Sequence, residues 1–179
     1  ARREVTAGVE RLFHFAAMAD KFDGAVHSAP YRGRTFAMHE PIGVIGIVCP
    51  DEAPLLALLS VAGAALAMGN RIVLVPSGRG PLVATDFYQV LDTSDVPAGA
   101  VSIVTGENDV LARVLAEHDD VDALWYFGSQ AGSAEVERAS VGNLKRTWVD
   151  YGLMRDWTDV TRGAGEGFLH QAGQVKNGW

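Results

Sequence analysis

The chain contains a single cysteine, Cys49, which is the first candidate for a nucleophile. It comes just before an expected helix, whose N-terminal dipole would favour a thiolate. Asp51 and Glu52 follow closely, and their negative charges oppose ionisation of the thiol. We therefore expect an unreactive, partly buried thiol. A single cysteine also excludes an internal disulfide framework, and an unpaired thiol suits a reducing cytoplasm.

The histidines are the next candidates for proton transfer or metal binding, and they are scattered along the chain. They are His14, His27, His39, His118 and His170. No two of them have the i, i+4 spacing of a helical zinc site. The sequence His118-Asp119-Asp120 has metal-binding residue types, but its place before an expected strand favours a solvated loop. We therefore predict no metal site, and the order of residues indicates no Ser-His-Asp arrangement.

Several polar residues lie where expected strands end and could serve either chemistry or local structure. The simplest prediction for Asp51 and Glu52 is an acidic N-cap region that suits the dipole of the next helix. Asp150 is predicted to cap a turn. Gly128 and Ser129 are predicted to form a strand–turn–helix joint, with Ser129 as the helix cap.

Apolar runs and helical repeats alternate along most of the chain and predict the elements that position these residues. Strands are expected over residues 42–49, 71–75, 101–104, 122–127 and 145–150. Helices are expected over residues 53–68, 81–93, 108–117 and 130–140. Strands that alternate with helices predict an α/β fold with an open parallel sheet of about five strands and flanking helices.

The two ends of the chain have a different pattern. Residues 4–24 predict an amphipathic helix, because apolar residues recur there at spacings of three and four. They are Val5, Val9, Leu12, Phe13, Ala16 and Ala17. Residues 31–40 (Tyr31–Glu40) predict an exposed strand, residues 166–172 a short helix, and residues 174–179 (Gln174–Trp179) a second strand. The two strands together predict a small β arm.

The composition is that of a globular domain, since 48% of the 179 residues are hydrophobic and 21% are charged. The net charge is −7 and the basic residues are dispersed, which argues against nucleic-acid binding. No apolar run reaches the roughly 18 residues that a membrane span needs. The first residues carry neither an initiator methionine nor a secretory signal pattern, which is typical of a processed piece or a fragment.

Five stretches resemble the aldehyde dehydrogenase family, in the order and at the spacing of that family. They are residues 41–50, 65–76, 95–106, 121–129 and 143–152, within a matched region of about 4–152. The resemblance implies a Rossmann-like, NAD- or NADP-binding fold that lacks the G-x-G-x-x-G fingerprint. Gly43 and Gly46 accordingly lie within the first strand, where small residues let a helix approach.

The sequence departs from the family pattern at positions with chemical roles. Glu52 stands where the family has the asparagine that donates a hydrogen bond to the oxyanion, and an ionised carboxylate has no donor. Val75 and Gly78 stand where the family has the lysine and glutamate that hold the adenosine ribose. Loss of two such contacts would weaken dinucleotide binding at least about tenfold. Asp150 stands at the position of the family's general base, one methylene shorter.

The resemblance leaves three candidate cofactor-binding residues, Ser77, Gly128 and Ser129, which we interpret as vestigial. In the family, a turn like that at Gly128 and Ser129 lies against the cofactor pyrophosphate. The family's catalytic cysteine lies in a separate domain after the base, whereas no cysteine follows Asp150 here. We therefore predict no catalytic residue and no tightly bound cofactor in this chain, although weak binding of NAD or NADP remains compatible with the resemblance.

The family resemblance also gives a hypothesis for the two strands at the ends. In the family, an arm at these places pairs with a neighbouring subunit. Residues 1–152 are therefore interpreted as a nucleotide-binding domain and residues 153–179 as a remnant of the arm. In this interpretation the catalytic domain that the family has between the two is missing. The chain would then be a degenerate second unit of a two-unit aldehyde dehydrogenase, a non-catalytic pseudoenzyme that assembles with itself or with a complete unit. Two alternatives are a regulatory NAD(P)-binding module, and the cofactor-domain fragment of a working enzyme that oxidises aldehydes to acids.

Overall fold

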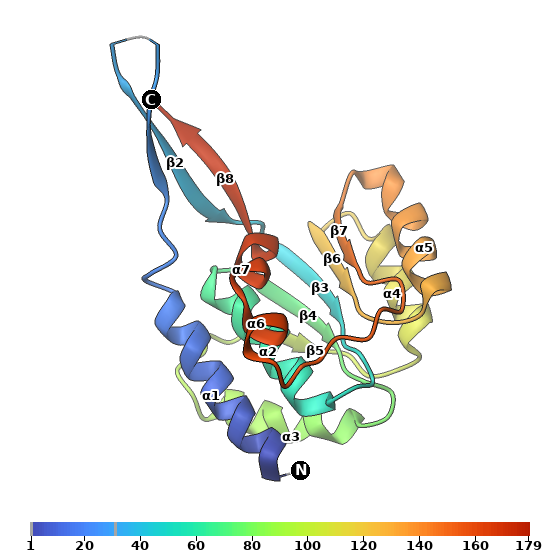
Figure 1. Cartoon of the computed structure of the whole chain (residues 1–179). Helices are drawn as coiled ribbons and strands as arrows, with labels where there is room; N and C mark the ends of the chain where they lie inside the picture. Colours follow the sequence, from blue (N-terminus) through green and yellow to red (C-terminus); the bar gives the residue numbers. More distant parts are fainter. Residues whose placement is uncertain (1, 31) are drawn as a thin grey trace.

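The computed structural model describes residues 2–30 and 32–179 as an α/β body from which a narrow arm extends (Figure 1). The helices are α1 (Arg2–Met18), α2 (Pro54–Ala67), α3 (Pro81–Asp92), α4 (Asn108–Glu117), α5 (Gln130–Ala139), α6 (Val160–Ala164) and α7 (Glu166–Ala172), with a 3-10 turn η1 (Ser140–Asn143). The strands are β1 (Ala25–Ser28), β2 (Arg34–Pro41), β3 (Val44–Val48), β4 (Arg71–Val75), β5 (Val101–Ile103), β6 (Ala123–Tyr126), β7 (Arg146–Val149) and β8 (Gly173–Gly178).

The body is built on a parallel sheet with the strand order β5-β4-β3-β6-β7. Strand β3 pairs with β4 on one side and with β6 on the other, and Ile45 lies opposite both Ile72 and Ala123. The strands that follow β3 are therefore added first on one side of it, as β4 and β5, and then on the other side, as β6 and β7. This confirms the predicted α/β class and the five parallel strands, and the reversal places a crevice at the carboxyl ends of β3 and β6.

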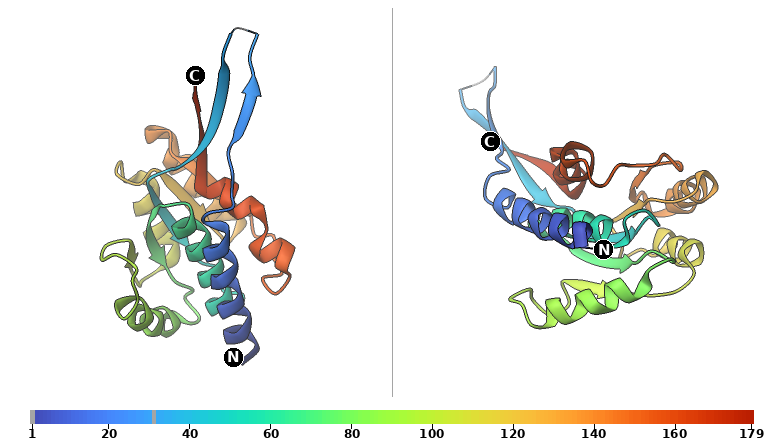
Figure 2. Two further views of the ribbon diagram at one scale, coloured as in Figure 1. Left: turned by 90° about the vertical axis from the view of Figure 1, so that its left-hand side faces the viewer. Right: turned by 60° about the horizontal axis from the view of Figure 1, so that its bottom comes forward.

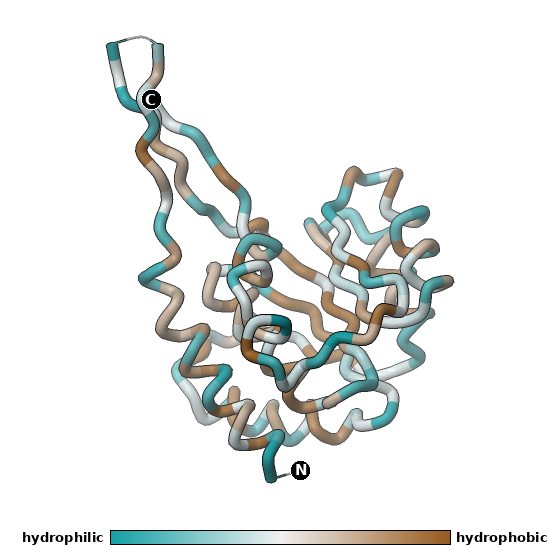
Figure 3. The backbone as a smooth tube through the Cα atoms, viewed as in Figure 1, coloured by the Kyte–Doolittle hydropathy of each residue, from teal (hydrophilic) through white to brown (hydrophobic). Residues whose placement is uncertain are grey.

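Alternate residues of the central strands enter two different cores. Ile45 and Ile47 belong to the larger core, to which α1, α2, α3, α6 and α7 contribute, whereas Val48 belongs to a smaller core with α4 and α5. The period of two is what a sheet covered on both faces requires. Figure 3 shows the hydrophobic residues concentrated in these central strands.

Gly46 shows why the first sheet strand contains a glycine. A Cβ atom at this position would lie 3.0 Å from Cδ1 of Leu124 and 3.3 Å from Cδ1 of Leu115. Leu115 belongs to α4, so the missing side chain lets this helix pack closely on β3. The predicted structural role of Gly46 is confirmed.

The first helix is shorter than predicted and faces the body with a different side. It ends at Met18 rather than near residue 24, and its buried residues are Gly8, Arg11 and Phe15. Val5, Val9 and Phe13 are exposed, Phe13 by 73% of its surface. The prediction that the apolar repeat forms the buried face is therefore wrong, because the helix faces the body with Phe15, which packs in the larger core, and with Arg11, which makes polar contacts to distant segments.

The inward contacts of Arg11 join the two ends of the chain. Its guanidinium is only 5% exposed and donates to Ser60 Oγ at 3.0 Å, to Trp157 O at 3.1 Å and to Gly163 O. Ser60 lies in α2, and Gly163 lies in α6, a short helix that the sequence did not predict. Arg11 thus ties α1 to both helices, and both views of Figure 2 show α1 beside α2.

Glu4, rather than Asp51 or Glu52, caps the N-terminus of α2. Its Oε1 accepts from Leu55 N at 2.9 Å and from Leu56 N at 3.1 Å. The N-cap residue is Ala53, which has a left-handed backbone and makes no side-chain cap. The predicted acidic N-cap region at residues 51–52 is therefore wrong, because α1 supplies the carboxylate from another part of the sequence.

The arm is a separate antiparallel sheet with the strand order β1-β2-β8. Strand β2 begins at Arg34, so most of the predicted strand is present, while Tyr31 lies outside the described residues. The sequence did not predict β1, whose Val26 lies opposite Phe36 of β2. Phe36 also lies opposite Gly178 of β8, which confirms a strand near residues 174–179. The strands β1 and β8 are both edges of this sheet.

Exposed apolar side chains mark the arm. Val26 is 58% exposed, Val175 is 58% exposed, and Phe36 and Met38 are about half exposed. A short sheet that shows both free edges and apolar side chains is a typical place for another chain to add a strand. Within the described residues, no helix is both long and apolar enough to span a bilayer.

Candidate functional site

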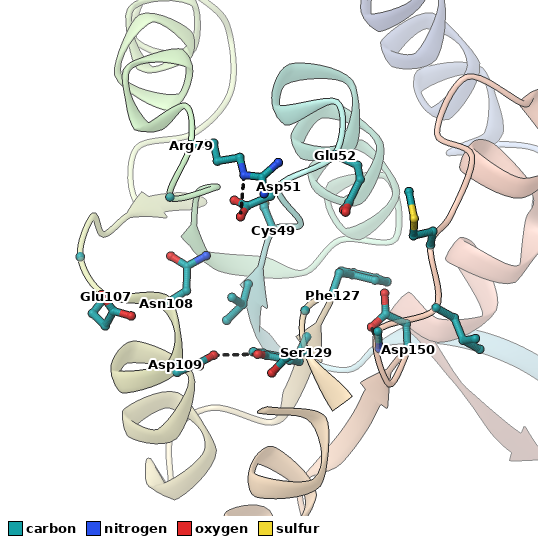
Figure 4. A pocket seen from close by; sticks show the side chains of 18 residues that line it. Cys49, Asp51, Glu52, Arg79, Glu107, Asn108, Asp109, Phe127, Ser129 and Asp150 are labelled. Carbon is teal, nitrogen blue, oxygen red and sulfur yellow. Dashed lines mark hydrogen bonds and ion pairs between the residues drawn. The ribbon is translucent and has the colours of Figure 1, made fainter. Parts of the chain in front are cut away.

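A polar crevice lies at the carboxyl ends of β3 and β6, where the strand order of the sheet reverses (Figure 4). It has a volume of about 420 Å³. Its walls come from the loop after β3, the loop before α4, the turn after β6 and the loop after β7. Ligands of open α/β sheets bind at such a reversal point, so this crevice, hereafter the cleft, is the candidate site.

The cleft is lined by acidic side chains. Its carboxylates are those of Asp51, Glu52, Glu107, Asp109 and Asp150. Among the described residues that line it, the only arginine or lysine is Arg79, whose Nε lies 3.4 Å from Oδ2 of Asp51, so that its charge is already paired. The cleft is therefore electrically unfavourable for a ligand that carries phosphate groups.

Ser77 lies beneath the cleft rather than in its wall. The residue is 1% exposed, and its hydroxyl donates to Asp51 Oδ1 at 2.6 Å while accepting from Arg79 N at 3.1 Å. This hydroxyl shapes the loop after β4. Gly78 does line the cleft, whereas Val75 is buried in the sheet. A cofactor-binding role for Ser77 stays a prediction.

The turn after β6 brings Gly128 and Ser129 into the cleft wall, as the family pattern would have it. Ser129 is the N-cap of α5, and its Oγ accepts from Gly132 N at 3.0 Å. The predicted capping role of Ser129 is confirmed. Figure 4 shows Ser129 beside Asp109, so even this part of the wall carries a negative charge.

Phe127 is a wall residue to which sequence reasoning gave no role. Its ring lies 5.1 Å from that of Trp148 and 5.5 Å from that of Trp157, in edge-to-face arrangements. The guanidinium of Arg155 lies 5.7 Å from the Phe127 ring and 5.2 Å from that of Phe168. These rings come from separate segments, so no spacing in the sequence could have shown the cluster. Burial lowers the pKa of Arg155.

Asp150 combines a turn with a position at the edge of the cleft. Its Oδ1 accepts from Gly152 N at 3.2 Å, which confirms the predicted turn cap. Burial raises the pKa of this carboxyl, with the Gly152 hydrogen bond and the charge of Arg155 acting in the opposite direction. A raised pKa suits proton transfer.

Cys49 is more deeply buried than the sequence predicted. It is 2% exposed and packs in the larger core at the floor of the cleft. Burial raises the pKa of the thiol to about 12. The thiol is therefore protonated at neutral pH and unsuited to attack on a carbonyl.

Cys49 is expected to react with a disulfide reagent such as DTNB at least about a hundredfold more slowly in the native protein than in guanidinium at pH 8. Its pKa rises from 9.0 to about 12 on folding, so its contribution to stability is present below pH 9 and is lost as the pH rises from 9 towards 12. Stopped-flow absorbance at pH 8 measures both rates. Equal rates in the folded and unfolded chain would contradict the burial of this thiol.

The histidines form no metal site in the described part of the chain. Nδ1 of His118 accepts from Asp120 N at 3.1 Å, and these residues form an exposed turn before β6. Across residues 2–30 and 32–179, no group of three or more histidine, cysteine, aspartate or glutamate side chains is arranged to hold a metal ion. The site residues described above are therefore the candidates for chemistry or binding.

Comparison with known proteins gives a consistent match. A family model described as the aldehyde dehydrogenase family matches residues 1–154. An aldehyde dehydrogenase from Agaricus bisporus is 34% identical over 150 residues, which cover 83% of this chain and 30% of that protein. The NADP/NAD-dependent aldehyde dehydrogenase PuuC of Escherichia coli (strain K12) is 29% identical over 184 residues, which cover 97% of this chain and 37% of that protein.

Solved structures agree with the sequence comparison. PnpE from Pseudomonas sp. WBC-3 superposes with a TM-score of 0.78 at 32% identity, over 82% of this chain and 30% of that one. The same protein has also been solved in complex with nicotinamide adenine dinucleotide. This chain thus spans about a third of the length of these relatives.

The interpretation of residues 153–179 as an arm remnant that follows a skipped catalytic domain stays a prediction. In the structure, β8 (Gly173–Gly178) at this end pairs with β2 of the arm.

Proposed function

The chain belongs to the aldehyde dehydrogenase family, and from this premise we propose that it is a non-catalytic unit of that family with a structural role in assembly. The observation that carries the proposal is the charge of the cleft. Its wall holds Asp51, Glu52, Glu107, Asp109 and Asp150 against the single, already paired guanidinium of Arg79. A unit with such a wall keeps the scaffold of the family without its chemistry.

The residues present do not fit the dinucleotide that the family implies. A dinucleotide brings two negatively charged phosphates, and the cleft offers them carboxylates instead of free cations. Val75 is buried in the sheet and Gly78 has no side chain, so neither replaces the family's ribose contacts. Glu4 already occupies the N-terminus of α2 with a carboxylate. These contacts support weak or absent cofactor binding.

The residues available for acyl chemistry support the same proposal. Glu52 lines the cleft at the family's oxyanion-donor position and, when ionised, would repel an oxyanion. Cys49, the single cysteine of the chain, is buried and has a pKa of about 12. Asp150 keeps a carboxylate with a raised pKa, but a base alone does not oxidise an aldehyde.

The arm supports the assembly role. The sheet β1-β2-β8 has two free edges, and the side chains of Val26 and Val175 on those edge strands are more than half exposed. A short sheet gains stability when it adds to another edge. We propose that the partner is a second copy of the chain or a complete aldehyde dehydrogenase unit. We further propose a cytoplasmic location, because a reducing compartment suits the unpaired thiol.

Titration calorimetry at low salt is expected to show no binding of NAD or NADP up to about 1 mM, because the cleft repels the phosphates. The variant E52Q/E107Q removes two charges from the cleft wall and is expected to show measurable heat. The variant E10Q/E166Q removes two exposed charges outside the cleft and is expected to behave like the unmodified chain. Binding of either cofactor by the unmodified chain below 1 mM would overturn the proposal.

A regulatory NAD(P)-binding module is the second candidate function, and one specific observation favours it. Gly128 and Ser129 line the cleft at the start of α5, and the structurally similar PnpE has been solved with nicotinamide adenine dinucleotide. Cofactor binding without turnover would favour this candidate. An aldehyde-dependent NADH signal, alone or after mixing with a complete unit, would instead indicate the cofactor-domain part of a working dehydrogenase.

A further inference from the structure

A second hollow lies beside α6 and α7, at the loop that follows β7. It has a volume of about 440 Å³, and the described residues that line it all come from residues 148–168. Residues 150–154 border both this hollow and the cleft, whereas Arg155 and Arg162 line only the hollow. Figure 1 shows this part of the chain running from β7 to α6. The hollow is therefore a site apart from the cleft.

The hollow carries a positive charge, in contrast to the cleft. Arg155 and Arg162 line it together with a single carboxylate, that of Asp150. Within the described residues, neither arginine forms an ion pair. The charge of Arg162 lowers the pKa of the exposed Asp156 only from a longer distance. Because no partner neutralises the two guanidinium groups, the hollow attracts a small anion.

The guanidinium of Arg155 is held in place by four aromatic rings, but the protein leaves most of its donors unused. Its Cζ lies between 5.2 and 5.7 Å from the four ring centroids. The rings are those of Phe127, Trp148, Trp157 and Phe168. Aromatic faces stabilise a cation without accepting in the plane of its N–H groups. Nη1 donates to Arg162 O at 2.8 Å, whereas Nε is buried without an acceptor among the described residues.

The free donors of Arg155 define the chemistry of the ligand. Its Nη2 makes no hydrogen bond within the described residues and, unlike Nε, is not enclosed, so a ligand can reach it. A carboxylate matches a planar guanidinium, because its oxygens accept from adjacent N–H groups. Leu153 and Met154 add an apolar rim to the hollow, with 75% and 77% of their surfaces exposed. The ligand therefore combines one carboxylate with a small apolar body.

We propose that this hollow binds a monocarboxylate whose apolar body has about the size of a phenyl ring. The carboxylate accepts from Nη2 of Arg155, and the exposed guanidinium of Arg162 adds attraction. Together with Asp150, the two arginines leave one net positive charge, which suits a monoanion better than a phosphate dianion. The site goes beyond the proposed function, because it needs neither the cleft nor an assembly partner.

Titration with benzoate at low salt tests the site, with the indole N–H signals of Trp148 and Trp157 as NMR reporters beside Arg155. We expect a dissociation constant of about 1 mM for benzoate and at least about tenfold weaker binding of benzamide, which has the same shape without the charge. R155K keeps the charge but loses the planar fork and is expected to weaken benzoate binding about tenfold. R162Q removes a charge at the rim and is expected to weaken it about threefold.

The control R3Q removes an exposed arginine of α1 that lies outside the hollow, and it is expected to bind benzoate like the unmodified chain. The site is refuted if benzoate causes no shift up to about 20 mM, since the hollow then holds only water. It is also refuted if benzamide binds as well as benzoate, or if R162Q and R3Q have equal effects. These two comparisons leave Arg155 unchanged, so they decide the matter even if R155K does not fold. Binding of NAD by the unmodified chain would count against the proposed function alone.

Discussion

Replacing Arg11 with methionine is expected to lower the free energy of unfolding by about 3 kcal/mol. The guanidinium is buried between α1, α2 and α6, where it donates to Ser60 Oγ and to the carbonyls of Trp157 and Gly163. Methionine fills a similar space but leaves those acceptors without a donor. Burial lowers the pKa of Arg11, and the charge of Asp159 opposes this shift.

Urea denaturation followed by tryptophan fluorescence measures this loss, since Trp157 contacts Arg11 directly. Arg113→Met is the matched control, because Arg113 is exposed on α4 and pairs with Glu117 at the surface. That control is expected to change stability by less than about 1 kcal/mol. Equal effects of the two substitutions would show that Arg11 does not clamp the two ends of the chain.

Placing lysine at Val26 and Val175 together is expected to weaken association of the chain by about a hundredfold. These residues lie on the edge strands β1 and β8 of the arm and are both 58% exposed. If a partner strand covers them, the two charges must be desolvated on binding. Lysine on an edge strand is also a known obstacle to strand addition.

Sedimentation velocity over a range of concentrations, with and without a complete aldehyde dehydrogenase, measures the association. The control V114K/V160K adds the same charge at two exposed valines, one on α4 and one on α6, both outside the arm. It is expected to associate like the unmodified chain. The assembly role would be contradicted if the unmodified chain stays monomeric and does not bind the complete enzyme. It would also be contradicted if both variants weaken the association equally.

The sheet could be predicted from sequence because its strands are apolar on both faces. The runs at β3, β4 and β6 are long enough to be distinctive, and most turns between elements of the sheet carry glycine or proline. The buried side of α1 could not be predicted in this way. Its inward residues include Glu4 and Arg11, and their partners lie in α2 and α6, far along the chain. Apolar periodicity contains no information about such pairs.

The site was predicted only where residues act locally or match a family pattern. Ser129 could be assigned to a helix cap, and Gly128 followed from the resemblance. Ser77 matched the same pattern, yet its hydroxyl is engaged by Asp51. The aromatic cluster around Arg155 and the contact between Tyr126 and Asp109 depend on how separate strands and helices meet.

Strand β8 pairs with β2 across almost the whole chain, with Gly178 opposite Phe36. During synthesis, β2 leaves the ribosome long before β8 and has only β1 beside it until residues 173–178 appear. A two-stranded hairpin alone is only marginally stable in water. The arm is therefore completed after the strands of the parallel sheet have been made, and until then β2 presents an unpaired edge. A strand of a neighbouring nascent chain can compete with β8 for this edge during that interval.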